Sequence, residues 1–307
     1  MTHDAIVVGG GPAGLAAATW LGRYRCTTLL IDAGEPRNRW TSHTHGYLGW
    51  DPATPKTLLQ AARAQVDVYD EVTVHEGRAV AARRDGDNFV VRVERDGSSE
   101  EVGASRLVLA TGVRDVFPDI PGFFDHYGTS VFHCPTCDGY EARGLPVVAI
   151  GWSAQIADFA IGLLNWASSV AVVTDGAAFE GDERLRRELA EHRIALHEED
   201  AVALVGSARD LRGIGLRGGT VLPCRMAFFS IAHEPVNALA RGLGCELDPD
   251  GSVAVNPAAM TSVPGVYAAG DLTSGLQLIQ VAAGKGALAG VGAARSLRPG
   301  LFDPPHP

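Results

Sequence analysis

The stretch AIVVGGGPAG, residues 5–14, is the part of the sequence that most clearly indicates the fold. Its first four residues form an apolar run typical of a buried strand, the glycines that follow predict a turn, and the alanine-rich residues 15–21 favour a helix. A second apolar run, TTLLI at residues 27–31, ends at Asp32. Strand, glycine turn, helix and strand in this order are typical of a βαβ unit that binds a dinucleotide.

Three glycines of this turn each have a structural role in binding a dinucleotide. Gly9 permits a tight turn, Gly11 lets backbone N–H groups approach a pyrophosphate, and Gly14 lets helix and strand pack closely. A carboxylate about twenty residues after the first glycine is placed to hold ribose hydroxyls. An ordinary glycine-rich turn is the alternative, but an acid at this distance favours a dinucleotide site. The residues of the predicted site are Gly9, Gly11, Pro12, Ala13, Gly14 and Asp32.

A second unit with the same order of elements lies in the middle of the chain. The apolar run 147–151 precedes a helical stretch at 154–165 and a further apolar run at 170–174. Its turn, GWSAQI at residues 151–156, keeps only the first glycine. Short strand-like runs between residues 72 and 102 predict a small antiparallel insert in the first unit. We therefore predict an α/β protein of two Rossmann-like domains with three ββα layers, the second inserted into the first.

Length, composition and charge limit the possible functions. The 307 residues suffice for about two domains, and 46% hydrophobic with 20% charged residues is typical of a soluble globular protein. A formal net charge of −10 repels phosphate backbones, so we expect no nucleic-acid partner. No apolar run is long enough to span a bilayer, and the start MTHD lacks the basic residues of a signal peptide. We therefore expect no membrane association and a cytoplasmic location.

The five cysteines do not form a secreted disulfide framework in a chain of this length. Three of them stand alone, while Cys134 and Cys137 form a CxxC motif. This pair is therefore the main candidate for chemistry that depends on sulfur.

Four landmarks occur in order along the chain: the glycine turn at 9–14, Ala110-Thr111-Gly112 after an apolar run, Cys134-Pro135-Thr136-Cys137-Asp138-Gly139, and Gly270-Asp271. With these landmarks the chain resembles, over essentially its whole length, the flavoprotein disulfide reductases, and specifically the low-molecular-weight thioredoxin reductase group. The resemblance implies FAD bound by residues 1–113 and 244–307 and a central domain at 114–243 that carries the cysteines. It also implies a homodimer.

The same resemblance implies roles for single residues. The glycine turn would hold the FAD pyrophosphate, Asp32 the adenosine ribose, and Asp271 the flavin-side ribityl or phosphate region. Cys137 would face the flavin and exchange electrons with it, Cys134 would react with the external disulfide, and Asp138 would shuttle the proton. The further implied FAD contacts are Ala110, Thr111, Gly112 and Gly270.

Two groups of residues have a simpler alternative. Cys134 and Cys137 could be half of a zinc site, with His133 adjacent, but a tetrahedral site needs two more ligands and there is no second CxxC, so we predict no metal. His43 and His45 lie on a polar loop and could line the flavin or substrate pocket, or be ordinary surface histidines.

The second glycine turn departs from the family's pattern, in which a GxGxxA turn and a His-Arg-Arg cluster hold NADPH. Ser153 and Ile156 replace the second glycine and the alanine, and the cluster positions read TDG at residues 174–176. The side chains of Trp152 and Ser153 could fill the space of the pyrophosphate, and Asp175 would repel a 2′-phosphate. We therefore predict that NADPH is not used, while NADH stays possible because an acid suits an unphosphorylated ribose.

A second departure concerns the end of the chain. The Arg-Gln pair that usually follows the Gly-Asp is replaced by QLIQV at residues 277–281. Together with HGYLG at residues 45–49, this resembles the branch that includes oxidases of small dithiols. Asp138 favours the reductases instead, because that branch commonly has histidine at this position.

The predicted function is thioredoxin reductase-like, FAD-dependent exchange of electrons between the flavin, the Cys134–Cys137 pair and an external thiol or disulfide. In one variant a ferredoxin or another reduced flavin supplies the electrons and the cysteines reduce a thioredoxin-like protein. In the second, a small-molecule dithiol reduces the cysteines and oxygen reoxidises the flavin. The third alternative is a flavin-binding redox sensor without turnover, which the retained cysteines and Asp138 disfavour.

Overall fold

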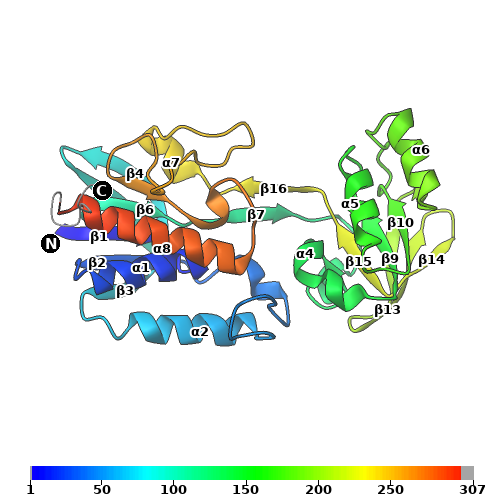
Figure 1. Cartoon of the computed structure of the whole chain (residues 1–307), viewed down its shortest axis with the longest axis horizontal. Helices are drawn as coiled ribbons and strands as arrows, with labels where there is room; N and C mark the ends of the chain where they lie inside the picture. The colour runs from blue at the N-terminus through cyan, green and yellow to red at the C-terminus, as the bar shows by residue number, and fades with distance from the viewer. Residues whose placement is uncertain (1, 299–307) are drawn as a thin grey trace, which may run out of the picture. The chain divides into compact units, whose positions relative to one another are not determined.

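The computed structural model describes residues 2–298 and contains two compact units. Unit 1 comprises Met1–Arg39, Gly46–Arg114 and Glu234–Pro307, and unit 2 comprises Trp40–His45 and Asp115–His233 (Figure 1). The short segment Trp40–His45 groups with unit 2, although unit 1 surrounds it in the sequence. The sequence-based boundaries are 113/114 and 243/244, and residues 299–307 of the last predicted segment lie outside the described residues.

Unit 1 is built on a seven-stranded sheet of order β3-β2-β1-β6-β5-β4, in which β17 also pairs with β6. Its strands are β1 (Thr2–Val8), β2 (Thr28–Asp32), β3 (Val72–Glu76), β4 (Arg78–Asp85), β5 (Asn88–Arg95), β6 (Ser98–Leu109) and β17 (Val266–Ala268). Strands β3, β2, β1, β6 and β17 pair in parallel, and β6, β5 and β4 form an antiparallel meander. The carboxyl ends of the parallel strands therefore meet at one edge.

The antiparallel insert predicted over residues 72–102 is wrong at its start. β3 pairs in parallel with β2, so that Thr28 lies opposite Val72, and belongs to the main sheet. The physical reason is the helix that precedes β3, because a strand reached through a helical crossover adds to a sheet in parallel. Farther along the chain, Val253 forms an isolated antiparallel bridge with Leu247.

Strand β1, in the middle of the sheet of unit 1, is buried on both faces. In β1, Ala5 and Val7 point into a core shared with the helices, whereas Ile6 and Val8 point into a second core on the opposite face. Alternation of this kind with apolar residues on both sides is typical of a covered parallel sheet. The helices and 3₁₀ turns of unit 1 are α1 (Pro12–Arg23), η1 (Arg37–Trp40), α2 (Pro55–Val66), α7 (Ala238–Leu243), η3 (Gly270–Leu272) and α8 (Ile279–Ser296).

Helices α1 and α8 lie side by side over the sheet (Figure 1). A Cβ on Gly286 would stand 2.0 Å from the Ala13 carbonyl oxygen, and one on Gly290 would stand 2.5 Å from that of Ala17. These distances are too short for any side chain, so glycine lets the two helices approach closely. Helix α8 is thereby held against the N-terminal half of α1.

Unit 2 repeats the β-turn-α-β order on a five-stranded parallel sheet of order β11-β10-β9-β15-β8. These strands are β8 (Val131–Phe132), β9 (Pro146–Ile150), β10 (Ser169–Val173), β11 (Ala195–His197) and β15 (Met226–Phe229). A three-stranded antiparallel sheet, which sequence analysis did not predict, consists of β12 (Ala201–Ser207), β13 (Asp210–Leu216) and β14 (Val221–Pro223). The helical elements of unit 2 are α3 (Phe123–His126), α4 (Pro135–Asp138), η2 (Gly139–Ala142), α5 (Ile156–Leu163) and α6 (Glu183–Glu191).

The predicted α/β class with two Rossmann-like units is confirmed. The chain leaves and re-enters unit 1 through β7 (Val113–Val116) and β16 (Ala232–Pro235), which pair with each other (Figure 1). Among the residues that the structure describes, none of the helices has the length and apolarity needed to cross a membrane.

Candidate functional site

The glycine turn between β1 and α1 brings together segments that are far apart in the sequence. A Cβ on Gly9 would stand 2.3 Å from the Ala110 carbonyl oxygen, and one on Gly10 would stand 2.1 Å from the Asp32 carboxyl carbon. The carboxyl ends of β1, β2 and β6 therefore meet at this turn, where the parallel strands predict a ligand site. The predicted residues Ala110, Thr111 and Gly112 continue from that edge, since the Gly112 carbonyl accepts a hydrogen bond from the Val236 N–H at 2.9 Å.

The turn itself has the form of an anion cradle. A Cβ on Gly14 would stand 1.7 Å from the Gly9 carbonyl oxygen, so the helix starts tight against the turn. Gly11 is the N-cap of α1, has no side-chain cap, and would have no atom within 4 Å of a Cβ. Because the first N–H groups of a helix have no partner within it, the open space beside Gly11 suits a phosphate. Pro12 adds no cost here, since it stands in the first turn of the helix.

Asp32 stands at the end of β2 with its carboxylate already oriented. Its Oδ1 accepts a hydrogen bond from the Gly34 N–H at 2.9 Å, and its Oδ2 accepts one from the Arg63 guanidinium on α2. The side chain is 16% exposed, so it is largely withdrawn from water. Sequence analysis did not find Arg63, because an arginine on an amphipathic helix gives no signal of its partner.

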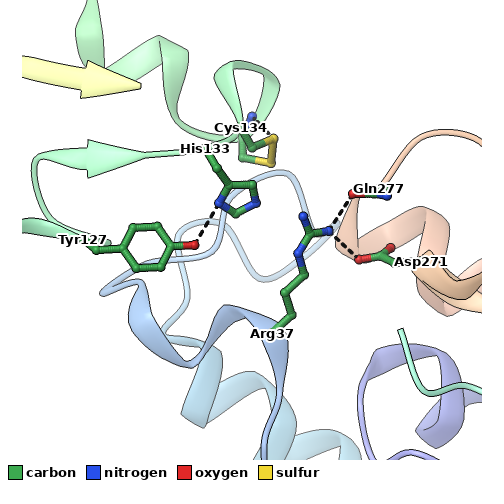
Figure 2. Close-up of a disulfide and its surroundings, with 7 residues drawn as sticks. Arg37, Tyr127, His133, Cys134, Asp271 and Gln277 are labelled. Atoms are coloured by element: carbon green, nitrogen blue, oxygen red, sulfur yellow. Dashed lines mark hydrogen bonds and ion pairs between the residues drawn. A yellow bond between two sulfur atoms is a disulfide. The ribbon is translucent and has the colours of Figure 1, made fainter. Parts of the chain in front are cut away.

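The Gly270–Asp271 segment lies against the same turn. A Cβ on Gly270 would stand 2.8 Å from the Ala13 Cβ. Arg37 donates from Nη1 to Asp271 Oδ2 at 2.9 Å and to Gln277 Oε1 at 2.7 Å, as Figure 2 shows. Arg37 and Asp271 are each 19% exposed, so this ion pair is largely withdrawn from water. Arg37 is a second residue that sequence analysis missed.

Lys285 on α8 holds the loop that follows Asp271. Its Nζ donates to the carbonyl oxygens of Thr273 at 3.1 Å and Ser274 at 2.8 Å. Burial lowers the pKa of Lys285, and the Asp271 carboxylate opposes that shift. The loop after β17 is thus held by two cations, Arg37 and Lys285, which lie on different elements.

In unit 2, Cys134 and Cys137 form a disulfide (Figure 2). Cys134 is the N-cap of α4, Pro135 opens the helix, and the Cys137 N–H donates to the Cys134 sulfur at 3.1 Å. The helix turn thus holds the two Cα atoms 5.2 Å apart, within the range of an ordinary disulfide. In residues 2–298 there is no group of three His, Cys, Asp or Glu side chains that could hold a metal ion.

The three other cysteines differ in their chemistry from this pair. Cys26, Cys224 and Cys245 are free and buried. Burial raises the pKa of each thiol, and that of Cys224 to about 12. A thiol that stays protonated is a poor nucleophile, so dithiol exchange is confined to the CxxC.

Asp138 directly follows the disulfide pair and is buried, with 8% of the residue exposed. Burial raises the pKa of its carboxyl from 3.8 to about 7, while the charge of His45 lowers it and Glu141 raises it. A carboxyl that titrates near neutral pH can both give and take a proton, as general acid–base chemistry requires. Of the two histidines on the loop, His45 is thus the one whose charge affects the pKa of Asp138. The His43 ring lies 6.2 Å from the His45 ring.

His133 lies on the other side of the disulfide in the sequence. Its Nδ1 and the Tyr127 hydroxyl are hydrogen-bonded at 3.0 Å (Figure 2). Tyr127 in turn packs in an aromatic cluster with Phe117, Phe123 and Phe229. The segment that leads into Cys134 is thus anchored by rings in the core of unit 2.

The corresponding turn of unit 2 has a different surface. Ile156 is fully buried, and a Cβ on Gly151 would stand 2.9 Å from its side chain. The Trp152 carbonyl accepts a hydrogen bond from the Glu180 N–H at 2.8 Å, which fixes the bulky residue at the turn. No glycine follows that would open space beside the helix start, in contrast to Gly11 of unit 1.

The end of β10, where a second nucleotide's ribose would lie, is acidic. Asp175 has a left-handed backbone, with φ 54°, and its Oδ1 accepts a hydrogen bond from the Ala201 N–H at 3.0 Å. Burial raises the pKa of Asp175, and the neighbouring Asp200 adds to that shift. Asp200 is itself ion-paired with the Arg217 guanidinium, so the carboxylate that a 2′-phosphate placed here would meet is that of Asp175.

A family model described as pyridine nucleotide-disulphide oxidoreductase matches residues 3–286. The chain belongs to this family. A thioredoxin reductase named tcpT from Claviceps purpurea is 33% identical in an alignment of 307 positions that covers 94% of this chain and 92% of the relative. The chain is therefore a thioredoxin reductase-like oxidoreductase enzyme.

Two solved structures are similar over nearly the whole chain. The crystal structure of HlmI has a TM-score of 0.90 at 33% identity and covers 96% of this chain and 92% of its own. An oxidoreductase from Agrobacterium tumefaciens has a TM-score of 0.86 at 34% identity, with 97% and 99% covered. The similarity includes both units and the segments that connect them.

FAD is the cofactor of this family, and the residues of unit 1 fit it. The open N-terminus of α1 can hold a pyrophosphate, and two carboxylates, Asp32 and Asp271, lie on segments that pack against the same turn. When bound, the flavin supplies two-electron chemistry between a donor and the disulfide.

Proposed function

We propose that this chain exchanges electrons between FAD held by unit 1 and an external thiol or disulfide, by way of the Cys134–Cys137 pair. One observation carries the proposal: a disulfide formed within a single helical turn stands directly beside a buried carboxyl whose pKa is about 7. A structural disulfide has no need of an acid that titrates at neutral pH, whereas dithiol exchange transfers a proton to or from a cysteine sulfur.

In this proposal each residue of the CxxC segment has one role. Cys137 exchanges electrons with the flavin, and Cys134 attacks or is attacked by the external disulfide or dithiol. Asp138 gives a proton to a thiolate when the disulfide is reduced and takes one when it is re-formed. The FAD contacts that we propose are Gly9, Gly11, Pro12, Ala13, Gly14, Asp32, Ala110, Thr111, Gly112, Gly270 and Asp271.

We propose further that NADPH is not the electron donor. The support is the filled turn at residues 151–156 and the carboxylate of Asp175 at the end of β10. A ferredoxin or another reduced flavin is the donor that we propose in its place.

The names of the relatives favour a thioredoxin-like protein as the disulfide partner. We propose that the protein works as a homodimer in the cytoplasm.

A second candidate is an oxidase of a small-molecule dithiol, with oxygen as the electron acceptor. Gln277 favours it, because this side chain, in place of the usual arginine, accepts the hydrogen bond of Arg37 beside Asp271. A flavin-binding sensor without turnover is less well supported, since it would not need Asp138.

An anaerobic titration of the flavin-loaded protein separates these functions. The flavin absorbance is followed while NADPH, NADH, reduced ferredoxin or a dithiol is added. We expect bleaching by ferredoxin or by a dithiol, and none within seconds by NADPH. Rapid bleaching by NADPH would reject the proposed donor, and bleaching by a dithiol alone would favour the oxidase.

A further inference from the structure

The segment Trp40–His45 packs within the unit that carries the redox cysteines. The Ser42 N–H donates to the Gly128 carbonyl at 3.2 Å, and the Trp40 ring lies 5.2 Å from that of Phe124. A Cβ on Gly128 would stand 2.0 Å from the Trp40 carbonyl oxygen, so the backbones are in close contact. This packing brings His45 to the CxxC segment from a distant part of the sequence.

His45 lies next to Glu141, which is in the segment that follows the cysteines. Its Nε2 is 3.7 Å from Glu141 Oε1, and Glu141 follows Asp138 by one turn. The His45 side chain is 24% exposed and that of Glu141 is 38% exposed, whereas Asp138 is buried. Exposure to water thus increases from the buried Asp138 carboxyl to the half-buried side chains of His45 and Glu141.

Asp138 requires a neighbouring group that can return its proton. A buried carboxyl that has given up its proton is a charge in a medium of low dielectric, so it must be reprotonated promptly. Two charged groups act on it, His45 from the segment 40–45 and Glu141 from η2, in opposite directions. Imidazole is the side-chain type suited to exchanging protons with water near neutral pH, so His45 is the member of this pair that we consider for that role.

We propose that His45 is the proton-exchange partner of Asp138, carrying protons between this buried carboxyl and solvent while Glu141 holds the imidazole in place. This rests on the proposed role of Asp138. When two electrons from a reduced flavin or an external dithiol enter the pair, the S–S bond breaks and two thiolates form. One thiolate takes the proton of Asp138, the carboxylate takes a proton from the His45 imidazolium, and the imidazole regains one from water. Oxidation of the dithiol reverses each transfer.

The test compares His45→Gln with His43→Gln in the full-length, flavin-loaded protein. His43 is an exposed neighbour on the same loop, so its variant is a matched control. Reduction of the disulfide is followed by stopped flow across the neutral pH range. We expect His45→Gln to slow it by at least about tenfold, with rescue by added imidazole, and His43→Gln to slow it less than about threefold.

A second readout does not depend on turnover. The carbonyl stretch of protonated Asp138, assigned with Asp138→Asn, gives the pKa of this carboxyl by infrared titration. Loss of the His45 imidazolium removes a charge that lowers this pKa, so we expect the titration midpoint to rise in His45→Gln and to stay unchanged in His43→Gln. His45→Asn serves as a second variant if His45→Gln unfolds at a lower temperature than the parent protein.

The outcomes separate this inference from the proposed function. Full activity of Asp138→Asn would reject the role of Asp138 itself. A slow Asp138→Asn with a normal His45→Gln rate, or a slow His45→Gln rate that imidazole does not rescue, would overturn the role of His45 alone. A midpoint that does not move in His45→Gln would overturn it as well.

Discussion

The turns at residues 9–14 and 151–156 follow equivalent strands but have different surfaces. In the first, Gly11 leaves open space at the start of α1, and Asp32 stands at the end of the next strand. In the second, Trp152, Ser153 and a buried Ile156 occupy the corresponding positions. The Rossmann-like frame is thus kept in both units, while the phosphate cradle is present in only one. Phosphate binding depends on accessible backbone N–H groups and not on the frame as such.

The largest effect that we expect comes from filling the intact turn. In Gly14→Val, the added side chain would stand where the Gly9 carbonyl lies, so α1 cannot keep its position on the turn. The dissociation constant of FAD, measured by flavin fluorescence, should rise at least about 100-fold, or about 2.7 kcal/mol. Gly162→Ala in α5 is the control, because its Cβ would meet no atom within 4 Å. Yellow, fully loaded Gly14→Val protein would contradict the assignment of FAD to this turn.

The second prediction concerns the division of labour between the two cysteines. Cys137→Ser should abolish the thiolate-to-flavin charge-transfer absorbance, since the proposal makes this sulfur the one that exchanges electrons with the flavin. Cys134→Ser should retain or strengthen that absorbance, because it frees the Cys137 thiolate. Anaerobic visible spectra of the two variants measure both effects. The opposite pattern would exchange the two roles.

The third prediction concerns two substitutions that make the second nucleotide turn more like the family's pattern. Ser153→Gly restores one missing glycine, and Asp175→Asn removes a negative charge while keeping a residue type that tolerates the left-handed backbone at this position. The double variant should shift the ratio of NADPH to NADH affinity toward NADPH by roughly fivefold to tenfold. The reason is that two unit charges about 4 Å apart in water interact by about 1 kcal/mol. Binding of each nucleotide is measured by calorimetry. An unchanged ratio would mean that Asp175 does not face the ribose.

The smallest expected effect is on stability. Burial raises the pKa of Asp138 to about 7 from 3.8, so the folded protein binds this proton more tightly than the unfolded chain. The stabilising contribution is therefore complete at low pH and is lost as the pH rises through about 7. Between pH values on either side of 7, the unfolding temperature of the parent protein should fall by a few degrees more than that of Asp138→Asn.

Thermal melts at each pH, with Asp158→Asn as an exposed control, measure this difference. Parallel curves for the parent protein and Asp138→Asn would show that this carboxyl is not held neutral by burial.

The elements that carry local signals could be predicted from the sequence. Residues 9–14 and Asp32 are recognisable because a glycine turn between a strand and a helix is a local pattern, and the CxxC is local as well. The pairing of β3 could not be predicted reliably, since strand-like residues do not name their partner. The same limit applies to Arg63 and Arg37, whose guanidinium groups meet Asp32 and Asp271 only after folding.

The sequence by itself determined the class of fold, the family and the CxxC pair, because each depends on short motifs whose residues are close together in the chain, and the family on several such motifs in a fixed order. Only the tertiary structure decided which charges meet. It joined Arg37 to Asp271, and it packed the loop of His45 against the segment of Asp138. The physical reason is that an ion pair or a pKa depends on distance in space, and packing of segments far apart in the chain sets that distance.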